Sequence, residues 1–292
     1  MKIAVLIQCH KNAEQVNMLI SALDHDCIDV YVHVDRKSNI VNDINSSNKI
    51  FILPEEKRIS VEWAKFSQVE ASLNLLLYAL SHDSYDYYWL ISGQDFPLVS
   101  ADRIVDFFSL NPDCNFVDIT TSLNSGLGKS NNLDKRNAIY YPEWILNKGI
   151  VFRIIKRAWV ELTGGYNRTF KLFRRNNTLD YPFFFGSQWW CICGKFAHYV
   201  MDYTNSHPEY QRYYINCNCS DESFFQTLLM NSIYKDFRRD YLLYVDWSEG
   251  NNSPKTLTVK DYDRVISSGK LIARKFDISI DRNIVDMIRE RM

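Results

Sequence analysis

The chain has 292 residues, of which 46% are hydrophobic and 14% aromatic, enough for one large domain with a buried core. Its net charge of −1 gives no global attraction to nucleic acid, so we expect no nucleic-acid partner. No apolar run reaches the roughly 20 residues that span a bilayer, and residues 1–7 are too short for a signal peptide. These features predict a cytoplasmic protein.

The cysteines favour the same compartment. Cys191 and Cys193 form one C-x-C pair and Cys217 and Cys219 a second, whereas structural zinc sites usually use C-x2-C spacing. Residues 191–193 also continue an alternating strand pattern. We therefore expect reduced, structural thiols.

The first third of the chain alternates strands and helices. Its pattern predicts a strand over residues 3–8 and a helix over 12–23, opened by a capping box of Asn12 and Gln15. No G-x-G-x-x-G sequence follows the first strand. A nucleotide would therefore bind without a glycine-rich phosphate loop.

Two further strands end in carboxylates. A strand over residues 29–34 ends at Asp35, where open α/β sheets bind ligands beyond the carboxyl ends of parallel strands. A helix over 61–80 follows, with an apolar face of Phe66, Val69, Leu73, Leu76, Leu77 and Leu80. The strand over 87–91 then enters a sharp turn at Asp95, which either contacts a sugar or bonds nearby turn amides.

Residues 219–229 place two carboxylates, Asp221 and Glu222, where a turn-prone segment meets an apolar run. Ser220 is the predicted N-cap of a helix whose buried stripe is Phe224, Leu228 and Leu229. Acids in a first turn are favoured by the helix dipole. Taken alone, these residues indicate ordinary helix-start chemistry more than catalysis.

Several different short motifs follow one another along nearly the whole chain, from residue 3 to about 280. They are His33-Val34-Asp35 and residues 63–70, 92–98, 185–190, 220–225, 245–247 and 273–276. In this order they resemble the core-2/I-branching glycosyltransferases, which include β-1,6-N-acetylglucosaminyltransferases and peptide O-xylosyltransferases. The resemblance implies an α/β, GT-A fold with a Rossmann-like, mostly parallel central sheet flanked by helices. It also implies one catalytic domain over 1–292, with a nucleotide-binding half at 1–115 and an acceptor-binding and catalytic half at 116–292.

The resemblance further implies an inverting mechanism without a metal ion or other cofactor. Glu222 matches the family's catalytic base, and this match alone favours it over Asp221. The residues implied to bind the donor or UDP are Asp35, Trp63, Lys255, Arg274 and Lys275. Those implied to contact the sugar or acceptor are Asp95, Gln188, Trp189 and Trp247.

The charges of the chain support metal-independent chemistry. The two Asp-x-Asp strings, at 24–26 and 261–263, lie away from the place where other GT-A enzymes hold a divalent ion. Lys255, Arg274 and Lys275 supply fixed cations, which can neutralise a leaving diphosphate in place of a metal. A metal-dependent GT-A transferase and a non-catalytic nucleotide- or glycan-binding protein with this fold remain the alternatives.

The predicted reaction moves a sugar from UDP to a glycan hydroxyl with β-linkage. By resemblance UDP-GlcNAc is the leading donor; residues 220–225 are nearer the xylosyltransferase form, and UDP-galactose is a further alternative. The animal relatives carry a membrane anchor and disulfides that this chain does not show. We therefore expect a bacterial-type enzyme of surface polysaccharide or oligosaccharide synthesis.

Residues 148–175 carry eight basic side chains against one acid, Glu161. Within them runs an apolar stripe of Ile150, Val151, Ile154, Ile155 and Trp159. A basic amphipathic helix suits an anionic membrane surface, here the inner face of a membrane that holds a lipid-linked oligosaccharide acceptor. A basic face for an acidic substrate, or a solvated helix with one buried side, explains the same pattern.

Overall fold

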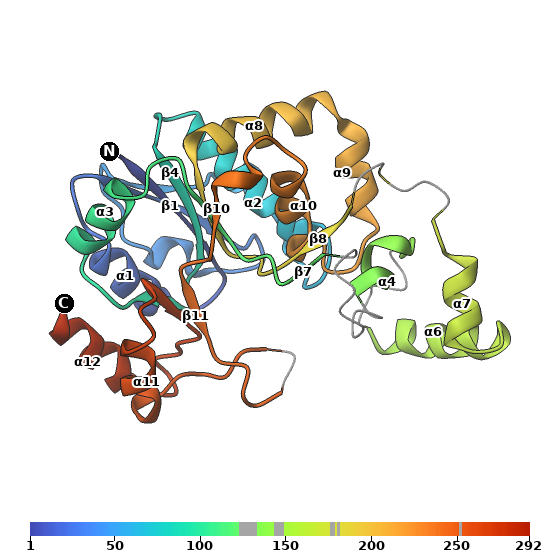
Figure 1. Cartoon of the computed structure of the whole chain (residues 1–292). Helices are drawn as coiled ribbons and strands as arrows, with labels where there is room; N and C mark the ends of the chain where they lie inside the picture. Colours follow the sequence, from blue (N-terminus) through green and yellow to red (C-terminus); the bar gives the residue numbers. More distant parts are fainter. Residues whose placement is uncertain (123–132, 143–148, 176–178, 180–181, 251–252) are drawn as a thin grey trace.

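A seven-stranded sheet lies at the centre of the protein (Figure 1). The structure, a computed structural model, describes residues 1–122, 133–142, 149–175, 179, 182–250 and 253–292. The sheet has the order β10-β6-β9-β4-β1-β2-β3. Its strands are β1 (Ile3–Cys9), β2 (Ile28–Val34), β3 (Ile50–Ile52), β4 (Tyr87–Ser92), β6 (Asn115–Val117), β9 (Trp190–Cys193) and β10 (Arg238–Arg239).

The half of the sheet that carries β1 is parallel. β1 pairs in parallel with both β2 and β4, and β2 pairs in parallel with β3. On the other side, β9 runs antiparallel to β4 and β6, and β10 is parallel to β6. The carboxyl ends of β1, β2 and β4 therefore meet at one edge of the sheet.

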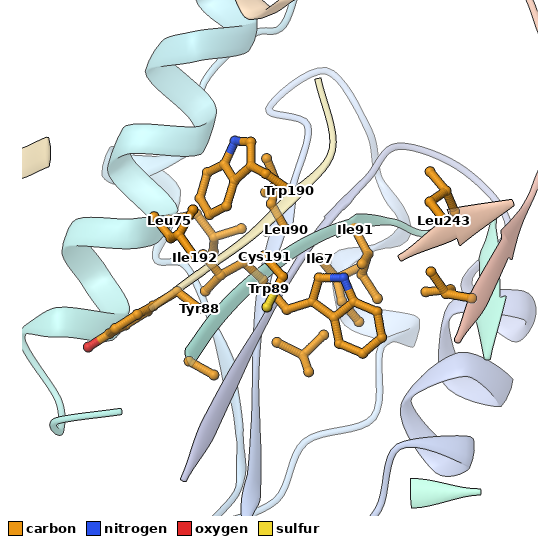
Figure 2. Close-up of a cluster of buried hydrophobic side chains, with 14 of the residues drawn as sticks. Ile7, Leu75, Tyr88, Trp89, Leu90, Ile91, Trp190, Cys191, Ile192 and Leu243 are labelled. Atoms are coloured by element: carbon orange, nitrogen blue, oxygen red, sulfur yellow. The ribbon is translucent and has the colours of Figure 1, made fainter. Parts of the chain in front are cut away.

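Helices cover both faces of the sheet (Figure 1). α2 (Ser67–Leu80), α8 (Gly194–Ser206) and α10 (Phe224–Met230) lie on one side, and α1 (Ala13–Ala22) and α3 (Ala101–Ser109) on the other. Alternate side chains of β4 follow this division: Tyr88 and Leu90 lie towards Leu75 of α2, while Trp89 and Ile91 point the opposite way (Figure 2). Strands buried on both faces read as continuous apolar runs, as β1 and β4 do.

Smaller elements extend this core. A three-stranded sheet consists of β5 (Asp95–Pro97), β12 (Ile272–Arg274) and β11 (Leu243–Val245), and β7 (Thr121–Ser122) pairs with β8 (Phe184–Phe185). The remaining α-helices of the described residues are α4 (Leu133–Ala138), α6 (Ile150–Leu162), α7 (Tyr166–Leu172), α9 (Pro208–Ile215), α11 (Tyr262–Ile266) and α12 (Asn283–Arg291). Short 3-10 turns include η3 (Ser220–Glu222) and η5 (Val259–Asp261).

The architecture confirms the predicted α/β class, and all seven cysteines are reduced thiols, as expected. Burial raises the pKa of Cys9 and of Cys217 to about 12, which keeps both thiols protonated and unreactive. Within the described part of the chain, no helix is both long and apolar enough to cross a membrane.

The start of α1 follows the prediction only in part. Asn12 is the N-cap, and its side-chain oxygen accepts a 3.2 Å hydrogen bond from the Gln15 amide. The Gln15 side chain does not complete a capping box. It donates instead to the carbonyls of Gly93 (3.0 Å) and Phe276 (3.1 Å), so this buried amide joins α1 to two distant loops.

The helix predicted over residues 61–80 begins only at Ser67, and Leu77 on its expected apolar face is exposed. Side chains hold the preceding backbone out of the helix. Ser67 Oγ accepts from the Glu62 amide (2.8 Å), and Gln68 Oε1 accepts from the Ala64 amide (2.7 Å). Such side-chain bonds compete with helix formation.

The predicted N-cap at Ser220 is also wrong, because α10 begins at Phe224. Ser220 is fully buried, and its hydroxyl donates to the Tyr214 carbonyl at 2.9 Å. The two carboxylates therefore lie in η3, before the helix. The apolar stripe is confirmed, since Phe224, Leu228 and Leu229 are all buried.

Candidate active site

A cavity of about 590 Å³ opens at the carboxyl ends of β1, β2 and β4. This is the edge at which open α/β sheets bind ligands. Residues that the sequence singled out form much of its wall: Asp35, Trp63, Gln188, Trp189 and Arg274. Polar residues that sequence reasoning missed complete the wall, among them Gln8, His10, Lys37, Gln68, Ser92 and Gln94.

Asp35 organises the loop that follows β2. Its Oδ1 accepts a 2.8 Å hydrogen bond from the Lys37 amide, and its Oδ2 accepts one of 3.2 Å from the Val61 amide. The Lys37 ammonium lies 3.9 Å from the same carboxylate. Asp35 thus fixes both the turn after β2 and the approach of the segment that carries Trp63.

His33, one residue before the end of β2, has a structural role. Its Nε2 accepts a 2.9 Å hydrogen bond from the Ile59 amide, which requires a neutral ring. Burial lowers the pKa of His33 to about 4 and keeps the ring in that form. His33 therefore positions the loop that forms one side of the cavity.

Gln68 connects two walls of the cavity. Its Oε1 holds the Ala64 amide, next to Trp63, and its Nε2 donates to Gln188 Oε1 at 3.2 Å. Gln188 also approaches Gln8, at the end of β1, at 3.5 Å. The feature of the sequence that could have identified Gln68 as a site residue is its position within the 63–70 motif.

Arg274 is a cation at the cavity wall, and its side chain is only 11% exposed. It ends β12 opposite Asp95 of β5, with Nε 3.5 Å from Asp95 Oδ1, and its guanidinium lies 4.4 Å from the centre of a Trp189 ring. Burial lowers the pKa of Arg274 and raises that of Asp95 to about 6, although the pair opposes both shifts. Asp95 Oδ2 accepts from the Ser92 amide at 2.8 Å, so the turn-amide interpretation of Asp95 is confirmed.

The hydrogen bonds of Arg274 are incomplete. Its buried Nε and Nη1 atoms form no hydrogen bond with any described residue, although Nε lies near Asp95. Buried donors are nearly always satisfied in native proteins, by protein groups, water or ligand. A guanidinium of this kind beside a cavity is suited to binding the oxygens of an anion.

Glu222 lies on a loop tied to the segments that carry the lining residues Trp63 and Gln188, although it is not itself among the lining residues. The Cys219 amide donates to the Ala64 carbonyl (3.0 Å), and the Gly186 amide donates to the Glu222 carbonyl (2.9 Å). Its carboxylate is 38% exposed and forms an ion pair with Arg136 of α4. Arg136 was missed because nothing in the sequence connects residues 86 positions apart.

Asp221, the neighbouring acid, has the opposite environment. Its side chain is buried, and Oδ1 has no hydrogen-bond partner in the described part of the chain. Burial, and next the charge of Glu222, raise the pKa of Asp221 to about 7. A base needs access to the acceptor. The geometry therefore favours Glu222 over Asp221 for that role.

Three other predicted site residues lie outside the cavity wall. Lys255 is bound to Asp261 at 2.7 Å, and Arg264 binds both Asp261 (2.7 Å) and Asp246 (2.5 Å), so these four charges balance. The remaining two residues are Lys275, which makes no ion pair with any described residue, and Trp247, which is 56% exposed.

Neither Asp-x-Asp string contributes to the cavity. Asp26 pairs with Lys49 at 2.6 Å, before the start of β2, and Asp261 belongs to the balanced charge cluster. Across the described ranges, no group of three or more His, Cys, Asp or Glu side chains is arranged to hold a metal ion.

A family model of Core-2/I-branching enzymes matches residues 3–265, and the chain belongs to this family. Together with the sheet and the position of the cavity, this membership confirms the predicted GT-A fold.

The chain is similar to several curated proteins. The Arabidopsis thaliana beta-glucuronosyltransferase GlcAT14A is 30% identical over 207 residues, covering 68% of this chain and 41% of the relative. Xylosyltransferase 2 of Homo sapiens is 22% identical over 316 positions, covering 98% of this chain and 33% of the relative. The chain thus spans less than half the length of these relatives. Among solved structures, mouse xyloside xylosyltransferase 1 in its apo form aligns with a TM-score of 0.39 and 6% identity, covering 94% and 97% of the two chains.

The buried Asp221 predicts a pH-dependent stability. The folded protein retains the Asp221 proton up to about pH 7, whereas the unfolded chain releases it near the ordinary value of 3.8. Between these values the folded state binds more protons, so this group makes the free energy of unfolding fall as pH rises, by at most about 1.4 kcal/mol per pH unit. We expect Asp221→Asn to remove this contribution in urea denaturation between pH 4 and 7. An unchanged slope in the variant would contradict the buried, protonated carboxyl.

Proposed function

We propose that this protein is an inverting, metal-independent glycosyltransferase that moves a sugar from a UDP-sugar to a glycan hydroxyl with β-linkage. The observation that carries the proposal is the arrangement at the sheet edge. The cavity has a largely buried cation, Arg274, in its wall, and backbone hydrogen bonds tie the Glu222 loop to Ala64 and Gly186, which lie close in sequence to the lining residues Trp63 and Gln188. The cation that would bind the leaving diphosphate and the carboxylate that would act as base therefore lie on segments at the same edge of the sheet.

In the proposed reaction, Glu222 takes the proton of the acceptor hydroxyl while the hydroxyl oxygen attacks the anomeric carbon. The bond from that carbon to the diphosphate oxygen breaks, and UDP leaves with the electron pair. Attack from the face opposite the leaving group inverts the anomeric centre. Arg136, already paired with Glu222, holds the carboxylate in position before the acceptor binds.

Cations stabilise the leaving diphosphate in this scheme. Arg274 supplies a guanidinium whose ion pair with Asp95 leaves its Nε and Nη1 atoms without a hydrogen bond in the described chain, and Lys275 follows it directly. Lys255 would join them only by exchanging Asp261 for the diphosphate. Asp35 and Trp63, which also line the cavity, are proposed to contact the nucleotide.

The sugar is proposed to lie between the nucleotide and Glu222. Gln188 and Trp189 line the cavity beside Arg274, which places them within reach of the donor sugar. Asp95 is fully buried and acts on this site through the position of Arg274. Trp247 follows β11, the strand next to Arg274, and its exposed ring suits stacking on an acceptor sugar.

The resemblance favours UDP-GlcNAc as donor, with UDP-xylose and UDP-galactose as alternatives, and the names of the relatives add glucuronic acid and support xylose. We propose a cytoplasmic enzyme of bacterial surface polysaccharide or oligosaccharide synthesis. Its acceptor would be a glycan or a lipid-linked oligosaccharide, met at the inner face of a membrane through residues 148–175. Lys148, one basic residue of that segment, lies outside the described residues.

The first test is UDP release from a panel of UDP-GlcNAc, UDP-xylose, UDP-galactose and UDP-glucuronic acid, with purified protein in EDTA. Because glycosyltransferases slowly hydrolyse their own donors, we expect release from one sugar nucleotide without any acceptor. Activity that is lost in EDTA and restored by Mn²⁺ would support a metal-dependent enzyme instead. Tight UDP binding with no release under either condition, and no transfer to glycan acceptors, would indicate a binding protein.

Glu222→Gln is expected to lower the rate of sugar transfer by about 10²- to 10⁴-fold, the usual contribution of a general base. The affinity for UDP should stay unchanged, because Glu222 does not line the cavity. Transfer rate and calorimetric UDP affinity are measured together. Glu209→Gln on α9, an exposed acid, is the matched control. Intact transfer in Glu222→Gln would show that another group is the base.

Lys275→Ala is expected to weaken UDP binding by at least about tenfold, since a charge-assisted hydrogen bond contributes roughly 1.5–3 kcal/mol. Lys255→Ala serves as the comparison, because its ammonium is already neutralised by Asp261 and should matter less. Isothermal titration with UDP measures both variants. Equal losses would place Lys255 in the donor site, and unchanged affinity in Lys275→Ala would exclude its contact with the diphosphate.

A further inference from the structure

α6 presents an apolar face to solvent. Ile154 is 65% exposed and Leu162 is 84% exposed, whereas Val160, on another side of the helix, is buried. The exposed apolar side chains of this helix, which we call the α6 face, are Ile150, Val151, Ile154, Ile155, Trp159 and Leu162. Figure 1 shows α6 and α7 projecting away from the central sheet. A contiguous apolar patch of this kind marks an interaction site on an otherwise folded protein.

Exposed cations accompany the α6 face. They are Arg153 and Arg157 on α6, Arg168 and Lys171 on α7, and Arg174 just after α7. Arg157 has an exposed partner in Glu161 at 3.7 Å, an ion pair that contributes little in water. Glu161 is the single acid among residues 150–175. The surface that surrounds the apolar face is therefore strongly positive.

Charge decides which partner fits this surface. A second copy that packed its own α6 face here would bring two sets of cations together, which is unfavourable. A nucleic acid would satisfy the cations but leave the apolar face in water. An anionic bilayer satisfies both, because acyl chains accept the apolar side chains while lipid phosphates bind the arginines and lysines.

We infer that α6 lies in the plane of an anionic membrane surface, with the α6 face in the acyl boundary and the α6–α7 cations on lipid phosphates. A lipid-linked acceptor would be met at this surface, and only that part rests on the proposed function. Binding to lipid itself requires no donor and no turnover.

Backbone pairing links this surface to the candidate base. Arg174 forms a β-bridge with Ile139, the Tyr140 amide donates to the Phe173 carbonyl (2.8 Å), and the Arg175 amide donates to the Ala138 carbonyl (2.9 Å). The segment that leaves α7 thus runs beside the end of α4, the helix that carries Arg136. A membrane held by α6 and α7 would present its headgroups on the side of the site where Glu222 lies.

The test is co-sedimentation of the full chain with vesicles of phosphatidylcholine alone and of phosphatidylcholine mixed with phosphatidylglycerol. We expect binding to the anionic vesicles, weakened by salt. The paired change Ile154→Ser with Leu162→Ser should reduce it at least about tenfold, because each buried aliphatic side chain contributes roughly 1.5–3 kcal/mol. Arg168→Glu with Lys171→Glu should reduce it about 30-fold or more.

Matched controls use equally exposed residues elsewhere. Leu110→Ser with Ile233→Ser changes two apolar side chains that are 81% and 80% exposed, and Lys235→Glu with Lys260→Glu changes two exposed cations. Neither pair should alter vesicle binding. Circular dichroism confirms that each variant is folded.

Other outcomes overturn the inference. They include no binding to anionic vesicles, equal binding by all variants, and a dimer in size-exclusion chromatography that the Ile154/Leu162 change disrupts without any vesicle binding. UDP release without vesicles should be unchanged in every variant. If UDP release is absent while vesicle binding follows the prediction, the proposed function is contradicted, whereas the inferred membrane-binding surface is supported.

Discussion

The pairing of β12 with β5 is the constraint on which the candidate site depends. It brings a strand from the end of the chain against the turn that leaves β4, and it sets Arg274 opposite Asp95. An unpaired guanidinium costs several kcal/mol to bury, so Arg274 is stable here only because Asp95 and the Trp189 ring surround it. The fixed positive charge of the cavity is thus a product of tertiary structure.

Close packing around the turn keeps this pairing in register. A side chain at Gly93 would place its Cβ 2.7 Å from the Cys9 Cβ and 2.9 Å from Val16 Cγ2, so only glycine lets the turn approach β1 and α1. Gln15 closes the arrangement from α1: besides its two donor bonds, its Oε1 accepts from the Ile278 amide at 3.0 Å. One buried side-chain amide therefore holds together α1, the turn at Gly93 and the segment 276–278.

Local pattern was enough to predict β1, β4 and α1, because their periodicity and the Asn12 cap are decided by neighbouring residues. It failed where a side chain bonds to backbone some residues away, as Gln68 does in delaying the start of α2. Asp35 and Arg274 were found through strand ends and motif order. The Arg136 contact had no sequence signal at all, since it exists only after α4 and η3 have come together.

Glu222 and Asp221 show how one short turn gives adjacent acids different chemistry. Neither lies in the first turn of α10, so the helix dipole invoked from the sequence is not what separates them. Cys219 adopts a left-handed conformation (φ 55°), and its amide is fixed to Ala64, which turns Asp221 inward and leaves Glu222 towards Arg136.

α4 supports this turn from its other side. The Asn218 amide donates to the Arg136 carbonyl (3.1 Å), and the Asn137 side chain donates to Ser223 Oγ (2.9 Å). The same short helix therefore fixes the loop before Glu222, the residue after it and the cation that pairs with its carboxylate. Because the end of α4 also pairs with the segment after α7, the position of the Glu222 carboxylate depends on the part of the molecule that carries the α6 face.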